Sequence, residues 1–139
     1  MREDKFKPIK ELFIDYLERE ATKINADFNY VSCRAYANFP PNHYEMGVGF
    51  FNMVIDCLLK NANFDKTDNL ALEIEVFDKN DNLTINADIC WGHPYSKTEA
   101  EVFDEPVDVT EQSLTMIKKK LPDLVSKLRE LLRDNPNGI

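Results

Sequence analysis

The feature that most constrains how this chain folds is a pair of alternating runs, residues 69–78 and 82–91. Every second residue in each run is apolar: Leu70, Leu72, Ile74 and Val76 in the first, and Leu83, Ile85, Ala87, Ile89 and Trp91 in the second. Alternation with a period of two is typical of a strand that buries one face. The segment between the runs holds aspartate, asparagine and lysine, so we expect the two strands to pair as an antiparallel hairpin.

The pairing of these strands decides the side of the sheet on which each residue lies. Trp91 shares the apolar side, and we expect it to be largely buried. Glu73, Glu75 and Asp88 fall on the other side, where Cys90 also lies, and the alternation predicts that these three carboxylates are exposed.

Three other segments are candidate strands. Residues 27–37 alternate, with Tyr30 and Tyr36 on the side opposite Cys33. Residues 47–62 fit either a buried strand or a helix with a narrow polar stripe, and their two glycines and β-branched residues favour the strand. Residues 99–107 are expected to add a short edge strand.

Helical patterns occupy both ends of the chain. Residues 4–23 carry apolar side chains at steps of three and four, which predicts an amphipathic helix with Pro8 in its first turn. Thr110 is a candidate N-cap for a second helix, whose leucines keep one helical phase through Pro122. We expect one kinked helix there, ended by Asn137 and Gly138.

A helix, a run of strands and a second helix indicate an α+β fold. We expect an N-terminal helix, an antiparallel meander of four to five strands and a long kinked C-terminal helix, with both helices on one face of the sheet. A length of 139 residues fits a single domain spanning 1–139. No secretory leader or bilayer-length apolar stretch is present, so we expect a cytoplasmic protein that does not bind membranes.

The stretch CWGHPY, residues 90–95, holds the chain's only tryptophan beside a cysteine and a histidine. Cys90 and His93 have the close spacing of a zinc-ligand pair, and the other candidate ligands are Cys33, Cys57 and His43. Structural zinc usually takes two close pairs, and no second pair exists in the sequence. We therefore expect the end of a strand here, buried reduced thiols, no metal and no cofactor.

The net charge of −8 is concentrated in the middle of the chain, where residues 24–109 hold fifteen acidic and five basic side chains. Such a segment repels nucleic acid and attracts a basic partner. The candidate partner-facing residues are Glu73, Glu75, Asp88, Glu99, Glu101, Asp104 and Glu105. The simpler interpretation is that these charges only solubilise the protein.

No catalytic or phosphate-binding motif is present, so we expect a binding protein rather than an enzyme. The favoured hypothesis is a small acidic inhibitor or immunity-type protein that neutralises a basic protein partner. The alternative is a small-molecule-binding protein or enzyme with an aromatic-lined pocket between sheet and helix. Its candidate lining is Tyr30, Tyr36, Tyr95, His43 and His93. A third hypothesis is a homodimer formed through an uncovered sheet face or edge.

Overall fold

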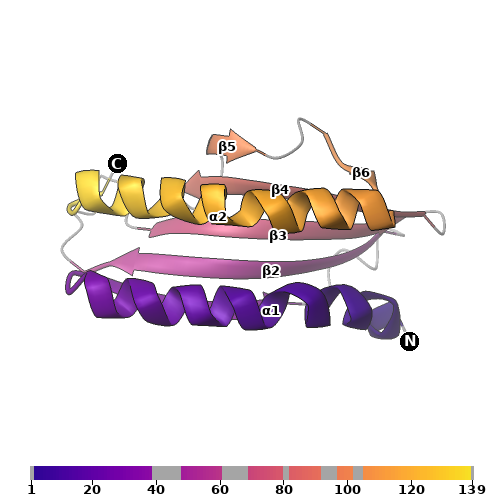
Figure 1. The fold of residues 1–139 in the computed structure, drawn as a ribbon, viewed down its shortest axis with the longest axis horizontal. Helices are drawn as coiled ribbons and strands as arrows, with labels where there is room; N and C mark the ends of the chain where they lie inside the picture. The colour runs from indigo at the N-terminus through magenta and orange to yellow at the C-terminus, as the bar shows by residue number, and fades with distance from the viewer. Residues whose placement is uncertain are drawn as a thin grey trace.

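A computed structural model describes residues 2–38, 48–60, 69–79, 82–91, 97–101 and 105–138. Two helices flank a run of strands in the chain (Figure 1). The elements are α1 (Arg2–Asp27), β1 (Val31–Asn38), β2 (Val48–Leu59), β3 (Asn69–Lys79), β4 (Asn82–Trp91), β5 (Lys97–Glu101), β6 (Val107–Asp108) and α2 (Glu111–Asp134). The expected α+β class is confirmed.

The strands form one antiparallel sheet in the order β1-β2-β3-β4-β5, with β6 also paired to β4. This is the expected meander, and residues 48–59 are a strand rather than a helix. The predicted hairpin is confirmed, since Lys79 pairs with Asn82 at the turn and Leu70 pairs with Trp91 at the far end. The predicted edge strand over residues 99–107 corresponds to two short strands, β5 and β6.

The core forms between the helices and alternate residues of the strands. α1 contacts β1 and β2, while α2 contacts β3 and β4, and Figure 1 shows the two helices running in the same direction. The ring of Phe6 on α1 stacks on that of Phe51 on β2, with centroids 5.4 Å apart. Each large apolar side chain buried in this core, from the helices as well as the strands, contributes roughly 1.5–3 kcal/mol to stability.

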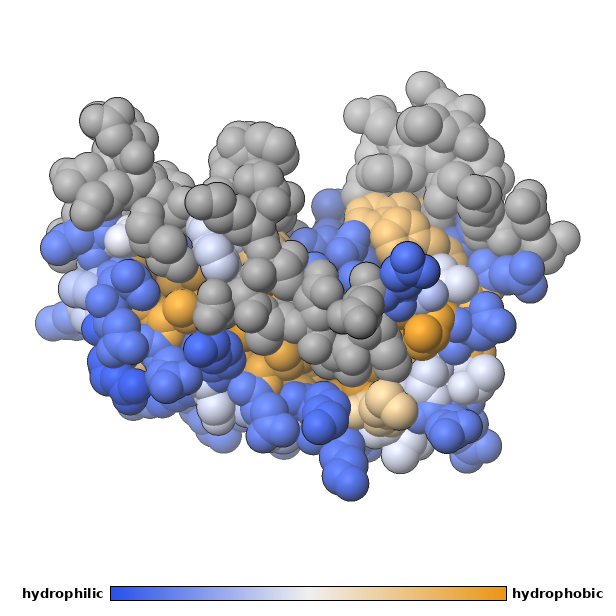
Figure 2. Space-filling view, turned by 90° about the horizontal axis from the view of Figure 1, so that it is seen from above, coloured by the Kyte–Doolittle hydropathy of each residue, from blue (hydrophilic) through white to orange (hydrophobic). Residues whose placement is uncertain are grey.

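The surface of the helices is polar because lysine, arginine and glutamate fill the positions between the buried ones. Figure 2 shows mostly hydrophilic atoms on the described surface, with apolar atoms gathered in a band along the middle. No helix among the described residues is long and apolar enough to cross a membrane.

α2 begins as the sequence predicts. Thr110 is its N-cap, and the Thr110 and Ser113 side chains each accept a hydrogen bond from the other residue's backbone N–H. The helix continues through Pro122 as one element and ends at Asp134, with Asn135 as its C-cap. It therefore ends before the Asn137–Gly138 pair that was expected to end it; Gly138, with φ of 97°, lies beyond the helix. The kink at Pro122 stays a prediction.

The C-terminal ends of the two helices are joined. Arg129 on α2 forms an ion pair with Asp27 on α1, and its guanidinium lies over the ring of Phe28. The hydroxyl of Tyr30 donates a hydrogen bond of 2.8 Å to the carbonyl oxygen of Leu132. These contacts fix α2 to the α1–β1 connection.

Candidate functional site

The candidate site lies on the face of the sheet opposite the main core. Three cross-strand rows of side chains there run from β1 to β4, and together we call them the outer patch. The rows are Arg34, Asp56, Ala71 and Cys90; Tyr36, Val54, Glu73 and Asp88; and Asn38, Asn52, Glu75 and Asn86. Strict alternation along four strands brings these twelve side chains to one face.

The centre of the outer patch is buried, and this corrects the sequence prediction. Glu73 and Asp88 were expected to be exposed, yet each is only 8% exposed. Glu75 is partly buried. The prediction was wrong because alternation shows which side chains share a face, but not whether that face is covered.

Apolar side chains surround these carboxylates. Val54, Ala71 and Cys90 form a second buried cluster, separate from the main core, and Tyr36 packs against it. Trp91 points to the core side as expected, but it is only partly buried because it ends β4. Both faces of the sheet therefore contain buried residues, although only one contains the main core.

Glu73 is held by two neighbours. The side-chain amide of Asn52 donates a hydrogen bond of 3.0 Å to one of its carboxylate oxygens. The thiol of Cys90 donates to the other oxygen at 3.9 Å. Burial raises the pKa of Glu73, and these two hydrogen bonds partly oppose that effect.

The outer patch has a strongly acidic environment. Burial raises the pKa of Cys90, and the nearby carboxylates, led by Glu73 and Asp88, raise it further. Arg34 is the patch's only basic residue, and its guanidinium lies 4.8 Å from the ring centroid of Tyr36. With Asp56 and Glu75, the patch holds four carboxylates against one guanidinium.

One cluster in the patch has metal-ligating chemistry. Carboxylate oxygens of Glu73 and Asp88 and the sulfur of Cys90 all lie within 4.8 Å of one another. Zn²⁺ binds carboxylate oxygens at about 2.0–2.2 Å and thiolate sulfur at about 2.3 Å. Ligand atoms of one zinc ion are therefore less than 4.8 Å apart, and the three atoms of this cluster meet that requirement. Cys33 and Cys57 lie on the core side, and the other two candidate ligands, His43 and His93, lie outside the described residues.

Two asparagines of the patch have buried oxygens that sequence reasoning missed. The side-chain oxygens of Asn52 and Asn86 are buried and have no hydrogen-bond partner among the described residues. They lie in one row with Glu75 between them. A signal for them is present in the sequence, since both asparagines share the alternation of the carboxylates.

The other predicted site residues are only partly placed by the structure. Glu105 is exposed, and Glu101 pairs with Asp88 across β5 and β4, which brings β5 beside the outer patch. The side chains of Glu99, Glu101 and Asp104 lie outside the described ones.

The expected aromatic pocket is not assembled from the described residues. Tyr30 packs against the main core, whereas Tyr36 packs against the second cluster. The remaining candidates, His43, His93 and Tyr95, lie outside the described residues.

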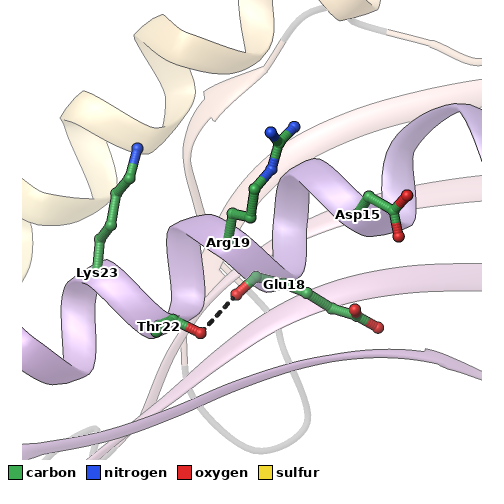
Figure 3. A pocket seen from close by; sticks show the side chains of 5 residues that line it. All are labelled: Asp15, Glu18, Arg19, Thr22 and Lys23. Atoms are coloured by element: carbon green, nitrogen blue, oxygen red, sulfur yellow. Dashed lines mark hydrogen bonds between the residues drawn. The ribbon is translucent and has the colours of Figure 1, made fainter.

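Two open hollows among the described residues lie on the helices, away from the outer patch. Figure 3 shows the first, on α1, lined by Asp15, Glu18, Arg19, Thr22 and Lys23. The Arg19 and Lys23 side chains extend away from those of Glu18 and Thr22, so the polar groups do not converge. The second is lined by residues 110–120 at the start of α2. Neither has the enclosed, convergent lining of a ligand site.

Comparisons with family models, with curated proteins and with solved structures gave no match for this chain.

Proposed function

We propose that this protein is a small acidic binding protein whose outer patch receives a cationic group of a basic protein partner. The observation that carries this proposal is the burial of Glu73 directly opposite Asp88 on neighbouring strands. Like charges placed opposite each other destabilise a sheet, and buried carboxylates lose their hydration. A guanidinium or ammonium group bound between them would offset both costs.

The surroundings of the two carboxylates support the same ligand chemistry. The buried oxygens of Asn52 and Asn86 can each accept a hydrogen bond from an N–H donor. Arginine presents five such donors in a planar fork, so one arginine side chain can satisfy carboxylate and amide oxygens together.

The acidic segment that begins in β5 and continues to Glu105 would act as the rim of this interface. Glu99, Glu101, Asp104 and Glu105 belong to it, and the pairing of Glu101 with Asp88 makes β5 a continuation of the patch. Exposed rim charges increase the association rate of a basic partner. The specific form of this function that we propose is an inhibitor or immunity-type protein that covers a basic cleft of its partner. We also propose that the protein works in the cytoplasm, where its three free cysteines would stay reduced.

The test uses peptides of opposite charge. An arginine-rich peptide should bind the protein, and a glutamate-rich peptide of the same length should not. Glu73→Gln combined with Asp88→Asn should weaken binding at least about tenfold, because each lost charge-assisted hydrogen bond costs about 1.5–3 kcal/mol. The matched control, Asp15→Asn with Glu18→Gln, changes the net charge equally on the exposed face of α1. Equal loss in both variants would show that only overall charge matters and would contradict the proposal.

A divalent metal ion is the second candidate ligand, because the ligand atoms of Glu73, Asp88 and Cys90 lie so close together. Glu73, Asp88 and Cys90 could each supply one ligand atom to an ion such as Zn²⁺, which would bind the Cys90 thiolate in exchange for its proton. Elemental analysis after dialysis against zinc separates the two candidates. One zinc per chain that is lost in Cys90→Ser would favour the metal, and a zinc-free protein that binds the basic peptide would favour the protein partner.

A further inference from the structure

A pair of cysteines on the core side of the sheet has no part in the proposed function. Cys33 on β1 and Cys57 on β2 are directly opposite each other in the strand pairing. Their sulfur atoms lie 2.9 Å apart, and both residues are buried free thiols. The third cysteine, Cys90, belongs to the outer patch, where its described neighbours include carboxylates and no other cysteine.

The backbone at this pair has the geometry that a disulfide between strands needs. The N–H of Cys33 donates a hydrogen bond of 2.8 Å to the side-chain oxygen of Asn25 on α1, and its carbonyl accepts one from the same side chain. The backbone polar groups of Cys33 therefore point away from β2, which makes Cys33 and Cys57 a non-hydrogen-bonded pair. Such pairs have Cα atoms about 4.5 Å apart, inside the range of roughly 4.4–6.8 Å found in disulfides.

We infer that Cys33 and Cys57 are a site of reversible oxidation, which forms a disulfide between β1 and β2 when the protein meets a peroxide. The strands need not move, because the two sulfurs only have to close from 2.9 Å to the bond length of about 2.05 Å. This inference is independent of the outer patch, so its failure would leave the proposed function unchanged.

The reaction begins at Cys33, which lies on the edge strand and is 6% exposed, whereas Cys57 is fully buried. The hydrogen bond with Cys33 and burial raise the pKa of Cys57, which keeps Cys57 protonated in the first step. The Cys33 thiolate attacks one peroxide oxygen, the O–O bond breaks and hydroxide leaves, so that Cys33 becomes a sulfenic acid.

The second step closes the disulfide. The sulfur of Cys57 attacks the sulfur of Cys33 and displaces its hydroxyl group, which leaves as water with the Cys57 proton. The proton that Cys33 releases when it becomes a thiolate neutralises the hydroxide of the first step. In sum, the two thiols lose two protons and two electrons, and one hydrogen peroxide becomes two waters. A dithiol reductant reverses the change by thiol–disulfide exchange.

The expected consequence is a more rigid edge of the sheet. The bond would close a loop between residues that are 24 apart in the chain, which removes freedom from the unfolded state. For a domain of this size the expected rise in melting temperature is roughly 10 °C. Because Asn25 links α1 to Cys33, the bond would also tie the end of α1 to β2.

The experiment treats the folded wild-type protein with hydrogen peroxide, alkylates the remaining thiols after denaturation and maps the products by mass spectrometry. The expected product is a peptide cross-link between Cys33 and Cys57, with Cys90 alkylated, a higher melting temperature and full reversal by dithiothreitol. Cys90→Ser is the matched control and should form the same cross-link. Cys57→Ala should form none.

Three results would overturn the inference. The first is that all three cysteines remain alkylatable at peroxide levels that oxidise the denatured chain. The second is a cross-link that involves Cys90. The third is a disulfide between Cys33 and Cys57 that lowers the melting temperature, which would mean that the folded sheet does not accommodate it. If Cys57→Ala fails to fold, the wild-type map and the Cys90→Ser map still decide the question.

Discussion

The two faces of the sheet are buried to a similar extent at their centres but are built from different residues. On the core side, Phe51, Ile55 and Leu72 are fully buried and meet the apolar faces of the helices. On the outer patch, Glu73 and Asp88 are also more than nine-tenths buried, among Val54, Ala71 and Cys90. Burial of apolar area stabilises the fold, whereas burial of carboxylates costs stability unless hydrogen bonds, a ligand or a proton compensate for it. The buried carboxylates are therefore the part of the sheet where stability and the proposed binding role make opposite demands.

The largest expected effect tests the core side. Phe51→Ala removes a fully buried ring that stacks on Phe6, and should lower the free energy of unfolding by about 3–5 kcal/mol. Urea unfolding followed by circular dichroism measures this loss. A loss below about 1 kcal/mol would mean that the packing against α1 is loose. The core side would then stabilise the fold no more than the outer patch does.

The next effect has the opposite sign and tests the outer patch. Glu73→Gln removes a buried charge but keeps an oxygen that can accept the hydrogen bond from Asn52. We expect the ligand-free variant to be more stable than wild type by about 1 kcal/mol at neutral pH. The same urea titration reports it. A loss of similar size would show that the carboxylate is already well compensated within the protein.

The stability difference between Glu73→Gln and wild type should depend on pH. Burial raises the pKa of Glu73 above its usual value of 4.5, so the folded protein binds this proton more tightly than the unfolded chain does. The destabilisation caused by Glu73 is full above the folded pKa and disappears as the pH falls through that value toward 4.5. The gain from Glu73→Gln should therefore shrink steadily in acid. A gain that does not change with pH would show that charge is not its origin.

The smallest effect on stability is expected at the acidic rim. Replacing Glu99, Glu101, Asp104 and Glu105 by their amides should change the free energy of unfolding by no more than about 0.5 kcal/mol per site. The association rate with a basic peptide should fall at low salt and match that of wild type above roughly 0.5 M salt, where screening is nearly complete. Stopped-flow fluorescence would measure both rates. Equal rates at low salt would show that the rim is only solvated.

The sequence predicted the features that depend on local periodicity. The hairpin of β3 and β4 was predicted with its register, because alternation and turn residues both mark it. The strand character of residues 48–59 was predicted against a helical alternative that the apolar pattern alone does not exclude. The N-cap at Thr110 was predicted from residue type and position.

Features that depend on distant contacts were not predicted. The burial of Glu73 and Asp88 depends on what covers their face, and no alternation encodes that. The contact between Cys33 and Cys57 depends on the register of β1 against β2. The sequence between these two strands carries no hairpin signature that would predict this register. Both features become visible only when the complete sheet is assembled.

Asn25 has a consequence for how molecules of this protein meet each other. Its amide occupies the backbone donor and acceptor of Cys33, on the free side of edge strand β1, where the strand of another chain would pair. An unprotected sheet edge is a template for polymerisation. Because the Asn25 side chain fills that position, the β1 edge is less able to pair with a strand of another molecule. Any self-association through strands should then start at the opposite end of the meander, beside β5.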